Sequence, residues 1–356
     1  MKGWAMDDAE REARRIEREE WAVDTLARRI AVVEDLAARA HDPLGWLAVR
    51  RQVHSYRRHL TAWQQGTWFA GISSVLVDHD ARLAHWSRKA DASLSGIDPD
   101  EQAQAAARLG VRLALMGKGG AGKTVVSSTL ARLLGRRGRP VLAADLDVNP
   151  GLSYSIGLRG ADVSLPVEAL AERAGAAYGW QLRPGLLPRE AVDRYAIRGP
   201  DGVSVTSLGK IGGLDKISAK RTVVAVVELL LGFGEPGWDV IADLEAGPTT
   251  PFERYHAFAD DVVVVVGPAW RSAMTARRLL PMVGEGRTTT IVANRFHHEP
   301  DHPGLAPRVR IPFDPEVAEA ERHGLAPLDA CPDSPAIRAI ARLAELLVPS
   351  EVARSA

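Results

Sequence analysis

The stretch from Leu113 to Val126, which reads LALMGKGGAGKTVV, constrains the fold of this chain more than any other. An apolar run comes first, a glycine-rich turn follows, and a helical pattern begins at Lys123. The turn has the spacing G-x-x-x-x-G-K-T, in which backbone N–H groups surround phosphate oxygens and the helix adds its positive end. This order of strand, turn and helix predicts a phosphate-binding loop.

The residues of this loop have separate expected tasks. Lys123 is expected to bridge the terminal phosphates of a nucleotide, and the hydroxyl of Thr124 to bind Mg²⁺. A second lysine, Lys118, is not required by the phosphate cradle itself. The loop residues expected to surround the nucleotide are Gly117, Gly119, Gly120, Ala121, Gly122, Lys123, Thr124 and Val125.

From Val111 onward, short apolar runs alternate with helical patterns. The runs that read as buried strands are 111–117, 140–147, 203–209, 239–245, 261–267, 288–294 and 308–312. Helices are expected at Lys123–Arg136, Thr222–Leu231, Ser272–Met282, Asp314–His323 and Ser334–Leu347. Because parallel strands are covered on both faces, apolar runs of this kind predict an α/β fold with a doubly wound, mostly parallel sheet. Residues 153–200 give no clear pattern.

The first hundred residues have a different texture, with six of the nine tryptophans and few strand-like runs. Helices are expected at about 7–40, 46–63 and 68–89. One face of the first helix carries Ile16, Val23, Leu26, Ile30, Val33, Ala37 and Ala40. We therefore expect a small helical domain at 1–95 with tryptophans in its core, a linker and short helix at 96–109, and a P-loop NTPase domain at 110–350.

Composition excludes several classes of protein. The 45 basic residues balance the 45 acidic ones, so the chain is not globally basic as nucleic-acid proteins often are. A single cysteine, Cys331, excludes an internal disulfide. The longest candidate membrane run, Gly66–Val77, is shorter than the roughly 20 residues of a membrane span, and the N-terminus lacks the apolar core of a secretory signal. We expect a cytoplasmic protein.

The form KGGAGKT resembles the deviant Walker A motif of the MinD/ParA/ArsA/CooC family of ATPases. In that family the first lysine, here Lys118, reaches across a dimer interface to the nucleotide of the other subunit. The resemblance covers roughly residues 110–348 and implies an ATP-dependent homodimer with slow ATP hydrolysis. A cation supplied by a partner would stabilise the charge that develops during phosphoryl transfer and would tie hydrolysis to association.

Two acidic segments extend the resemblance. AADLDVNPGL resembles the family's switch I, which implies that Asp147 positions the attacking water and that Asp145 helps to hold the Mg²⁺ shell. An aspartate that caps the following turn is the alternative interpretation. DVIADLEAG resembles the Walker B and switch II segment, so that Asp243 would hold Mg²⁺ through water and Gly247 would donate an amide to the γ-phosphate.

The base pocket is expected at the next strand ends. Asn294 matches the family position whose side-chain amide reads adenine, and IPFDPEVAEA, which includes Pro312, resembles the segment that wraps the base. The guanine signature N/T-K-x-D is absent from ANRF, so ATP is favoured over GTP.

Within the family, several segments are similar to the CooC-like branch, which serves nickel insertion. The positions of that branch's metal-binding cysteine pair read Lys216 and Ser218 here, which are not soft ligands. We expect a switch that regulates or assembles a protein client and contacts this client through the N-terminal helices. A ParA-like positioning ATPase that binds DNA and a CooC-like metallochaperone are the alternatives.

Three further patterns each leave two interpretations. Arginines 50, 51, 57 and 58 form either a solvated helix face, which is favoured, or a nucleic-acid contact. The histidine-rich loop 297–302 is either an exposed loop or a metal site. The C-terminal apolar face, with Ile337, Ile340, Leu343, Leu346 and Leu347, packs against the sheet or lies on a membrane, and packing is favoured.

Overall fold

The chain folds into two units, each assembled from separate stretches of the sequence. The first unit contains Met1–Leu109, Val167–Ala191 and Lys220–Pro236, and the second contains Gly110–Pro166, Val192–Ala219 and Gly237–Ala356. A computed structural model describes residues 8–147, 151–159, 164–172, 180–208, 216–246, 255–283, 287–297 and 304–348. The predicted boundaries at 95 and 110 stay a prediction.

The second unit is built on one sheet, in which the described residues form eight strands in the order β10-β9-β8-β1-β7-β2-β6-β5. The strands are β1 (Arg112–Gly117), β2 (Val141–Leu146), β5 (Ile197–Arg198), β6 (Val203–Ser207), β7 (Asp239–Leu244), β8 (Asp261–Val266), β9 (Thr288–Phe296) and β10 (Val309–Pro312). Every neighbouring pair is parallel except β5 and β6. The predicted doubly wound, mostly parallel sheet is confirmed.

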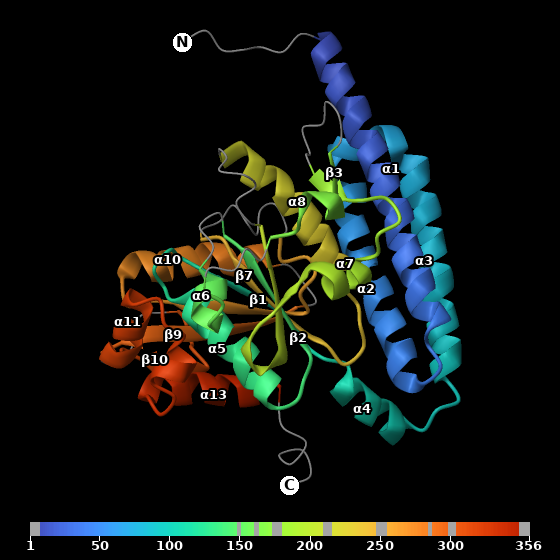
Figure 1. Cartoon of the computed structure of the whole chain (residues 1–356). Coiled ribbons are helices and arrows are strands. Elements are labelled where there is room, and N and C mark those ends of the chain that lie inside the picture. The colour runs from blue at the N-terminus through green and yellow to red at the C-terminus, as the bar shows by residue number, and fades with distance from the viewer. Residues whose placement is uncertain are drawn as a thin grey trace. The chain divides into compact units, whose positions relative to one another are not determined.

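Helices cover both faces of this sheet (Figure 1). The core on one face joins α5 (Lys123–Arg136) and α13 (Pro335–Leu347) to the strands, and α10 (Trp270–Leu279) covers the other face. The remaining short helices are α6 (Leu152–Ile156), η3 (Pro200–Gly202), η4 (Leu280–Met282), α11 (Pro315–Arg322) and α12 (Pro327–Ala330). The apolar face of α13 packs against the sheet at Ile337, Ile340 and Leu343, as predicted, whereas Leu346 of the same face is 36% exposed.

One buried carboxylate fixes the register of the central strands. Asp239, the first residue of β7, is 0% exposed and accepts a hydrogen bond from the backbone N–H of Val111 at 2.8 Å. The guanidinium of Arg139, just before β2, donates to the same carboxylate at 2.5 and 2.8 Å. The amino ends of β1, β7 and β2 are thereby joined, so their carboxyl ends also meet at one edge.

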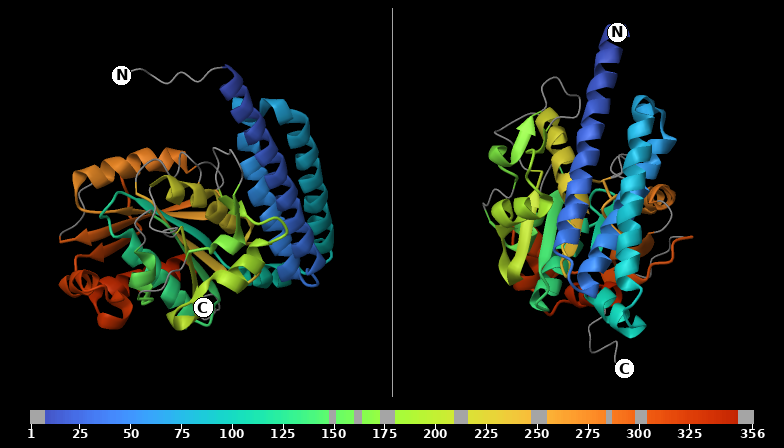
Figure 2. Two further views of the ribbon diagram at one scale, coloured as in Figure 1. Left: turned by 45° about the horizontal axis from the view of Figure 1, so that its top comes forward. Right: turned by 90° about the vertical axis from the view of Figure 1, so that its right-hand side faces the viewer.

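The first unit contains three long helices that run side by side (Figure 2). Its N-terminal elements are α1 (Asp8–Ala38), α2 (Pro43–Gln65), η1 (Thr67–Ile72), α3 (Ser73–Leu94) and α4 (Pro99–Arg108). Asp42 starts α2 by accepting a hydrogen bond from the N–H of Gly45 at 2.7 Å. Later stretches add η2 (Val167–Ala169), the hairpin of β3 (Leu170–Glu172) and β4 (Trp180–Leu182), the start of α7 (Pro188–Tyr195) and most of α8 (Lys216–Gly232).

Two sequence predictions about this unit are wrong in part. Among the tryptophans whose side chains the structure describes in this unit, Trp63 is buried, but Trp21, Trp46 and Trp86 are only partly covered. The predicted stripe on α1 also fails at its start, where Ile16 is 45% and Val23 37% exposed. Aliphatic residues fill the core instead, among them Leu26, Ile30, Val33, Leu36, Val49, Val53 and Leu60. The expected third helix begins later, at Ser73, after a 3₁₀ segment.

Two of the four arginines on the arginine-rich face of α2 have acidic partners within the unit. Arg57 forms an ion pair with Asp80 of α3 at 2.9 Å, and Arg50 lies 3.9 Å from Asp91. This pairing supports the solvated-face interpretation. In the part of the chain that the structure describes, no helix is both long and apolar enough to span a membrane.

Gln52 joins α2 to the end of α8, and its loss should weaken the first unit. The side chain is 0% exposed, and its Nε2 donates to the carbonyl of Leu231 at 2.7 Å. We expect Gln52→Met to lower the free energy of unfolding by about 1–3 kcal/mol, because that carbonyl would lose a buried partner. Urea denaturation measures the change. The exposed Gln64→Met on the same helix should change it by less than about 0.5 kcal/mol, and equal effects would contradict this role.

Candidate nucleotide site

Two glycines allow the loop between β1 and α5 to fold where no side chain fits. Gly117 has φ 153°, and a Cβ placed there would lie 2.3 Å from the carbonyl oxygen of Val265. Gly122 has φ 85°, and a Cβ there would lie 2.3 Å from Nδ2 of Asn294. Glycine therefore meets both the backbone conformation and the close approach. The loop has the strand-to-helix context that the sequence predicted.

The two lysines differ in exposure. Lys123 is the first residue of α5, and its side chain is 7% exposed. Its charge acts on the carboxylate of Asp243, whose pKa it lowers. Lys118 is only half-buried at the start of the loop, where its carbonyl accepts a hydrogen bond from the N–H of Ala121 at 3.1 Å. Lys118 is thus less enclosed than Lys123.

The hydroxyl of Thr124 and the carboxylate of Asp243 meet beneath the loop. Thr124 Oγ1 donates to Asp243 Oδ2 at 2.5 Å, which joins the first turn of α5 to the end of β7. Asp243 is 2% exposed, and its Oδ1 has no hydrogen-bond partner among the described residues. A hydroxyl and a carboxylate with an unused buried oxygen are ligands that suit Mg²⁺, so the residues present fit that ion.

The carboxylate of Asp145 accepts hydrogen bonds from the backbone that follows β2. Its Oδ1 accepts a hydrogen bond from the N–H of Asp147 at 3.0 Å. Its Oδ2 accepts from the N–H groups of Gly151 and Leu152, both at 2.8 Å. The capping interpretation therefore describes Asp145 in this structure, and the carboxylate contributes charge to the site from a fixed position. Asp147 lies on the same turn and is half-buried.

Burial is the largest cause that raises the pKa values of two neighbouring acids. Asp145 and Asp243 are register partners on adjacent parallel strands. Burial, followed by the charge of Asp145, raises the pKa of Asp243 to about 7, against the opposing effects of Lys123 and of the Thr124 hydrogen bond. Burial likewise raises the pKa of Asp145 to about 6, although three backbone N–H groups oppose it. A cation between these groups would favour their ionised forms.

The end of β9 supports the loop from a second side. Asn294 is buried, and its Nδ2 donates to the carbonyl of Ala121 at 2.7 Å. The next residue, Arg295, has φ 63°, donates to the carbonyl of Gly120 at 3.3 Å and pairs with Glu321 of α11. The amide expected to read adenine therefore makes a hydrogen bond within the protein here. The positive φ of an arginine is a strained conformation that persists only where neighbouring contacts hold it.

Arg295 and Glu321 were not among the residues predicted from the sequence. The pair Asn-Arg at a strand end is the one sequence signal for Arg295. No local pattern identifies Glu321 as the partner of Arg295. Both residues line a pocket beside the loop together with Asn294, Pro312, Phe313 and Val317. The segment predicted to wrap a base thus lies next to the residue predicted to read it.

Some predicted residues lie outside the described part of the chain. These are Gly247 and four members of the histidine-rich loop, His298, Glu299, Asp301 and His302, together with the side chains of Lys216 and Ser218. The remaining member, His297, stacks on Phe313 with ring centroids 4.5 Å apart. Within the described ranges, no cluster of three histidine, cysteine or acidic side chains could hold a metal ion.

Comparison with known families agrees with this geometry. Residues 113–328 match the family described as CobQ/CobB/MinD/ParA nucleotide binding domain. The chain belongs to this family. It is a MinD/ParA-type P-loop protein in which helices precede the nucleotide-binding domain.

Curated relatives and solved structures are consistent with the assignment. An uncharacterised ATP-binding protein of Methanocaldococcus jannaschii is 26% identical over 59% of this chain and 88% of its own length. The carbon monoxide dehydrogenase accessory protein CooC of Rhodospirillum rubrum is 27% identical over 62% of this chain and 91% of its own. The septum site-determining protein MinD of Pyrococcus horikoshii, solved with Mg-ADP, has a TM-score of 0.52 at 20% identity over 66% of this chain and 95% of its own. This last likeness concerns the fold.

Gly122→Ala should weaken nucleotide binding by more than the cost of placing alanine in a left-handed backbone conformation. We expect at least a tenfold loss of nucleotide affinity, measured by titration with a fluorescent ADP analogue, because the added methyl group would meet the fixed amide of Asn294. Gly138→Ala is the matched control. Its φ of 75° carries a similar cost for alanine, yet no heavy atom lies within 4 Å of the added Cβ. An equal loss in both variants would contradict the role of the close approach.

The raised pKa of Asp243 should make Mg²⁺-dependent nucleotide binding sensitive to pH. Below about pH 7 this carboxyl is increasingly protonated, and a proton competes with the metal ion. We expect the gain in affinity from Mg²⁺ to fall by up to about tenfold per unit as the pH drops from 7 to 6. Titrations with and without Mg²⁺ measure it. Asp243→Asn is the control, because it removes the carboxyl group but leaves the titration of the nucleotide itself. If the variant shows the same pH dependence of Mg²⁺-assisted binding as the wild type, the assignment to Asp243 is refuted.

Proposed function

We propose that this protein is an ATP-hydrolysing switch that dimerises in its ATP-bound form and regulates or assembles a protein client. The observation that carries the proposal is the contact of Thr124 with the buried Asp243 beneath a loop that holds two lysines. The ATP-binding relative and the family match support the choice of nucleotide.

Thr124 would bind Mg²⁺ directly, and Asp243 would hold it through water. When bound, the ion neutralises negative charge on the terminal phosphates. Asp145 already accepts three backbone hydrogen bonds, so it would add charge to the metal shell rather than a further ligand bond. Lys123, which is buried at the start of α5, would bridge the same phosphates from the loop side.

Asp147 would orient the attacking water. It follows β2 directly and lies on the turn that Asp145 holds rigid, so a hydrogen bond from its carboxylate could fix the water's position. Asn294 and Arg295 would hold the loop in shape through the carbonyls of Ala121 and Gly120, which keeps the inward N–H groups preorganised for phosphate. Pro312 and its neighbours would enclose the base.

Lys118 would complete the site of a second copy of the chain. Its half-exposed side chain is available to a partner, unlike the enclosed Lys123. Charge from the partner would stabilise the transition state only while the dimer persists, which would make hydrolysis the step that resets association. The helices of the first unit would contact the client.

The two alternatives gain no support from the described residues. DNA positioning would use a basic face, and two of the four arginines in the basic cluster of α2, Arg50 and Arg57, are already paired with Asp91 and Asp80. A CooC-like metal carrier would need soft ligands, and the single Cys331 is buried in the core with its thiol donating to the carbonyl of Pro327.

Lys118→Ala should separate nucleotide binding from dimer-dependent hydrolysis. We expect unchanged ATP affinity, loss of the ATP-dependent dimer in analytical ultracentrifugation, and a fall of about a hundredfold or more in phosphate release. Lys89→Ala, which removes an exposed lysine of α3, is the control and should behave as wild type. If the Lys118 variant both dimerises and turns over ATP normally, the proposed switch is wrong.

Asp147→Ala should trap the ATP-bound state together with its client. We expect slow phosphate release with intact ATP binding, a dimer that persists for longer, and enrichment of one protein when the variant is used as bait with ATP rather than ADP. Phosphate release at the wild-type rate would refute the role of Asp147 in orienting water.

A further inference from the structure

The first unit contains a pocket that no step of the proposed function uses. Its walls come from α1, α2, the chain that leads from β4 into α7, and α8. The wall is largely apolar, with Val32, Tyr56, Leu182, Leu186 and Pro188 among its residues. All of these stretches belong to one unit, although they lie far apart in the sequence.

A buried arginine forms part of this wall. Arg29 is 2% exposed, and its Nη2 contacts Oε1 of Glu228 at 2.8 Å and Nδ1 of His59 at 2.9 Å. The guanidinium carbon lies 4.8 Å from the ring centroid of Trp63 and 5.4 Å from that of Tyr56. Aromatic faces stabilise the cation but accept no strong hydrogen bonds. The arginine is therefore held in place by one carboxylate, one imidazole and two aromatic rings.

Hydrogen-bonding capacity remains unused at this position. Within the described chain, Nε and Nη1 of Arg29 have no hydrogen-bond acceptor. Buried donors without acceptors cost free energy, and an arginine matches a carboxylate especially well because its donors form a planar fork. Arg28 also lines the pocket. The pocket lining therefore contains two basic side chains and one acidic side chain, Glu228.

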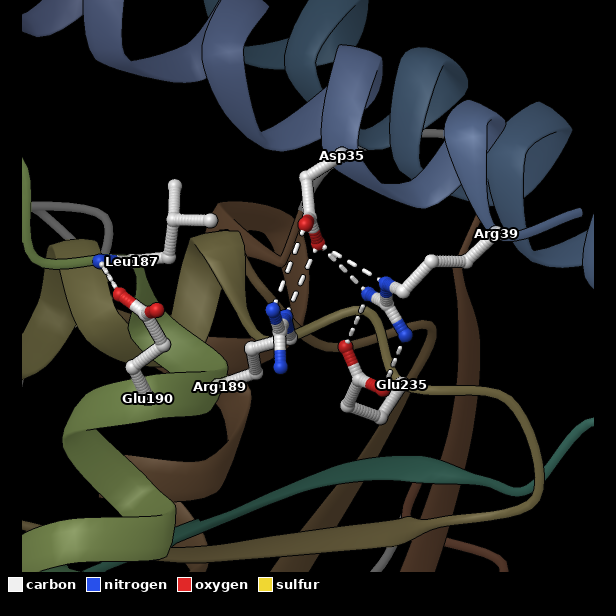
Figure 3. A network of polar contacts seen from close by, with 6 residues as sticks. All are labelled: Asp35, Arg39, Leu187, Arg189, Glu190 and Glu235. Carbon is white, nitrogen blue, oxygen red and sulfur yellow. Dashed lines mark hydrogen bonds and ion pairs between the residues drawn. The ribbon is translucent and has the colours of Figure 1, made fainter.

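A network of ion pairs joins α1 to the chain next to the pocket residues Leu187 and Pro188 (Figure 3). Asp35 of α1 accepts from Nε of Arg189 at 3.0 Å and from Nη2 of Arg39 at 2.7 Å, and Arg39 also pairs with Glu235 at 2.7 Å. Glu190 accepts from the N–H of Leu187, a pocket residue, at 3.1 Å. A wall held in this way is preformed, which lowers the entropic cost of binding.

We propose that this pocket binds a small organic acid with an apolar hydrocarbon body and one anionic group. The apolar wall would take the body of the ligand, and the anion would approach Arg29, whose Nε and Nη1 have no acceptor among the described residues. A purely apolar ligand would leave the unused donors unsatisfied, and a cationic ligand would be repelled by the two arginines.

Matched eight-carbon probes test the charge preference. Octanoate, 1-octanol and octylammonium share one hydrocarbon body, and each is titrated into the full-length protein by calorimetry. We expect one octanoate site per chain, with at least tenfold weaker binding of 1-octanol and of octylammonium. Equal affinities for the three probes, or no octanoate binding, would overturn the proposal.

Two variants locate the binding at this pocket without removing the buried arginine. Ala31 is an exposed pocket residue of α1, so Ala31→Phe should block octanoate by at least tenfold, whereas the exposed Ala27→Phe one turn earlier should not. Glu228→Gln removes the opposing charge and should strengthen octanoate binding several-fold. Thermal unfolding confirms that each variant is folded. Binding that survives Ala31→Phe, or that weakens in Glu228→Gln, would refute the assignment.

Discussion

The arrangement of the nucleotide site depends on how three parallel strands are aligned. Asp239 joins the amino ends of β1, β7 and β2 through Val111 and Arg139, and the ladder then carries that register along each strand. Because strand partners stay level, Asp145 and Asp243 end side by side. A slip of one residue would turn each of these side chains to the opposite face of the sheet. The position of the site residues at the carboxyl ends of the strands thus depends on Asp239 at their amino ends.

Local sequence predicted the elements that carry the phosphate loop. The helix expected at Lys123–Arg136 has these bounds in the structure, because a left-handed glycine forces its start and the loop spacing admits few folds. Asp243 and Thr124 were each predicted from their own motif as Mg²⁺ residues, and they are in contact in the structure. Roles in binding and catalysis remain predictions.

What the sequence did not reveal depends on contacts between distant residues. The partnership of Arg295 with Glu321 joins a strand end to a helix, and neither residue has a local pattern that marks it. The use of Asp145 as a cap could be stated only as an alternative, since the same residue type serves turns and metal ions equally well. In the helical region, tryptophans suggested a core, yet the aliphatic residues of α1 and α2 supply it because large rings are seldom fully enclosed.

The first unit takes two stretches, Val167–Ala191 and Lys220–Pro236, from within the sequence that follows the phosphate loop. Evolution or engineering therefore cannot treat the N-terminal helices as a detachable module. A shortened chain that began at Gly110 would retain the whole loop, but it would leave the carbonyl of Leu231 and the carboxylate of Glu228 without the side chains that now satisfy them. Exchange of this region between relatives would succeed only if all three stretches were moved together.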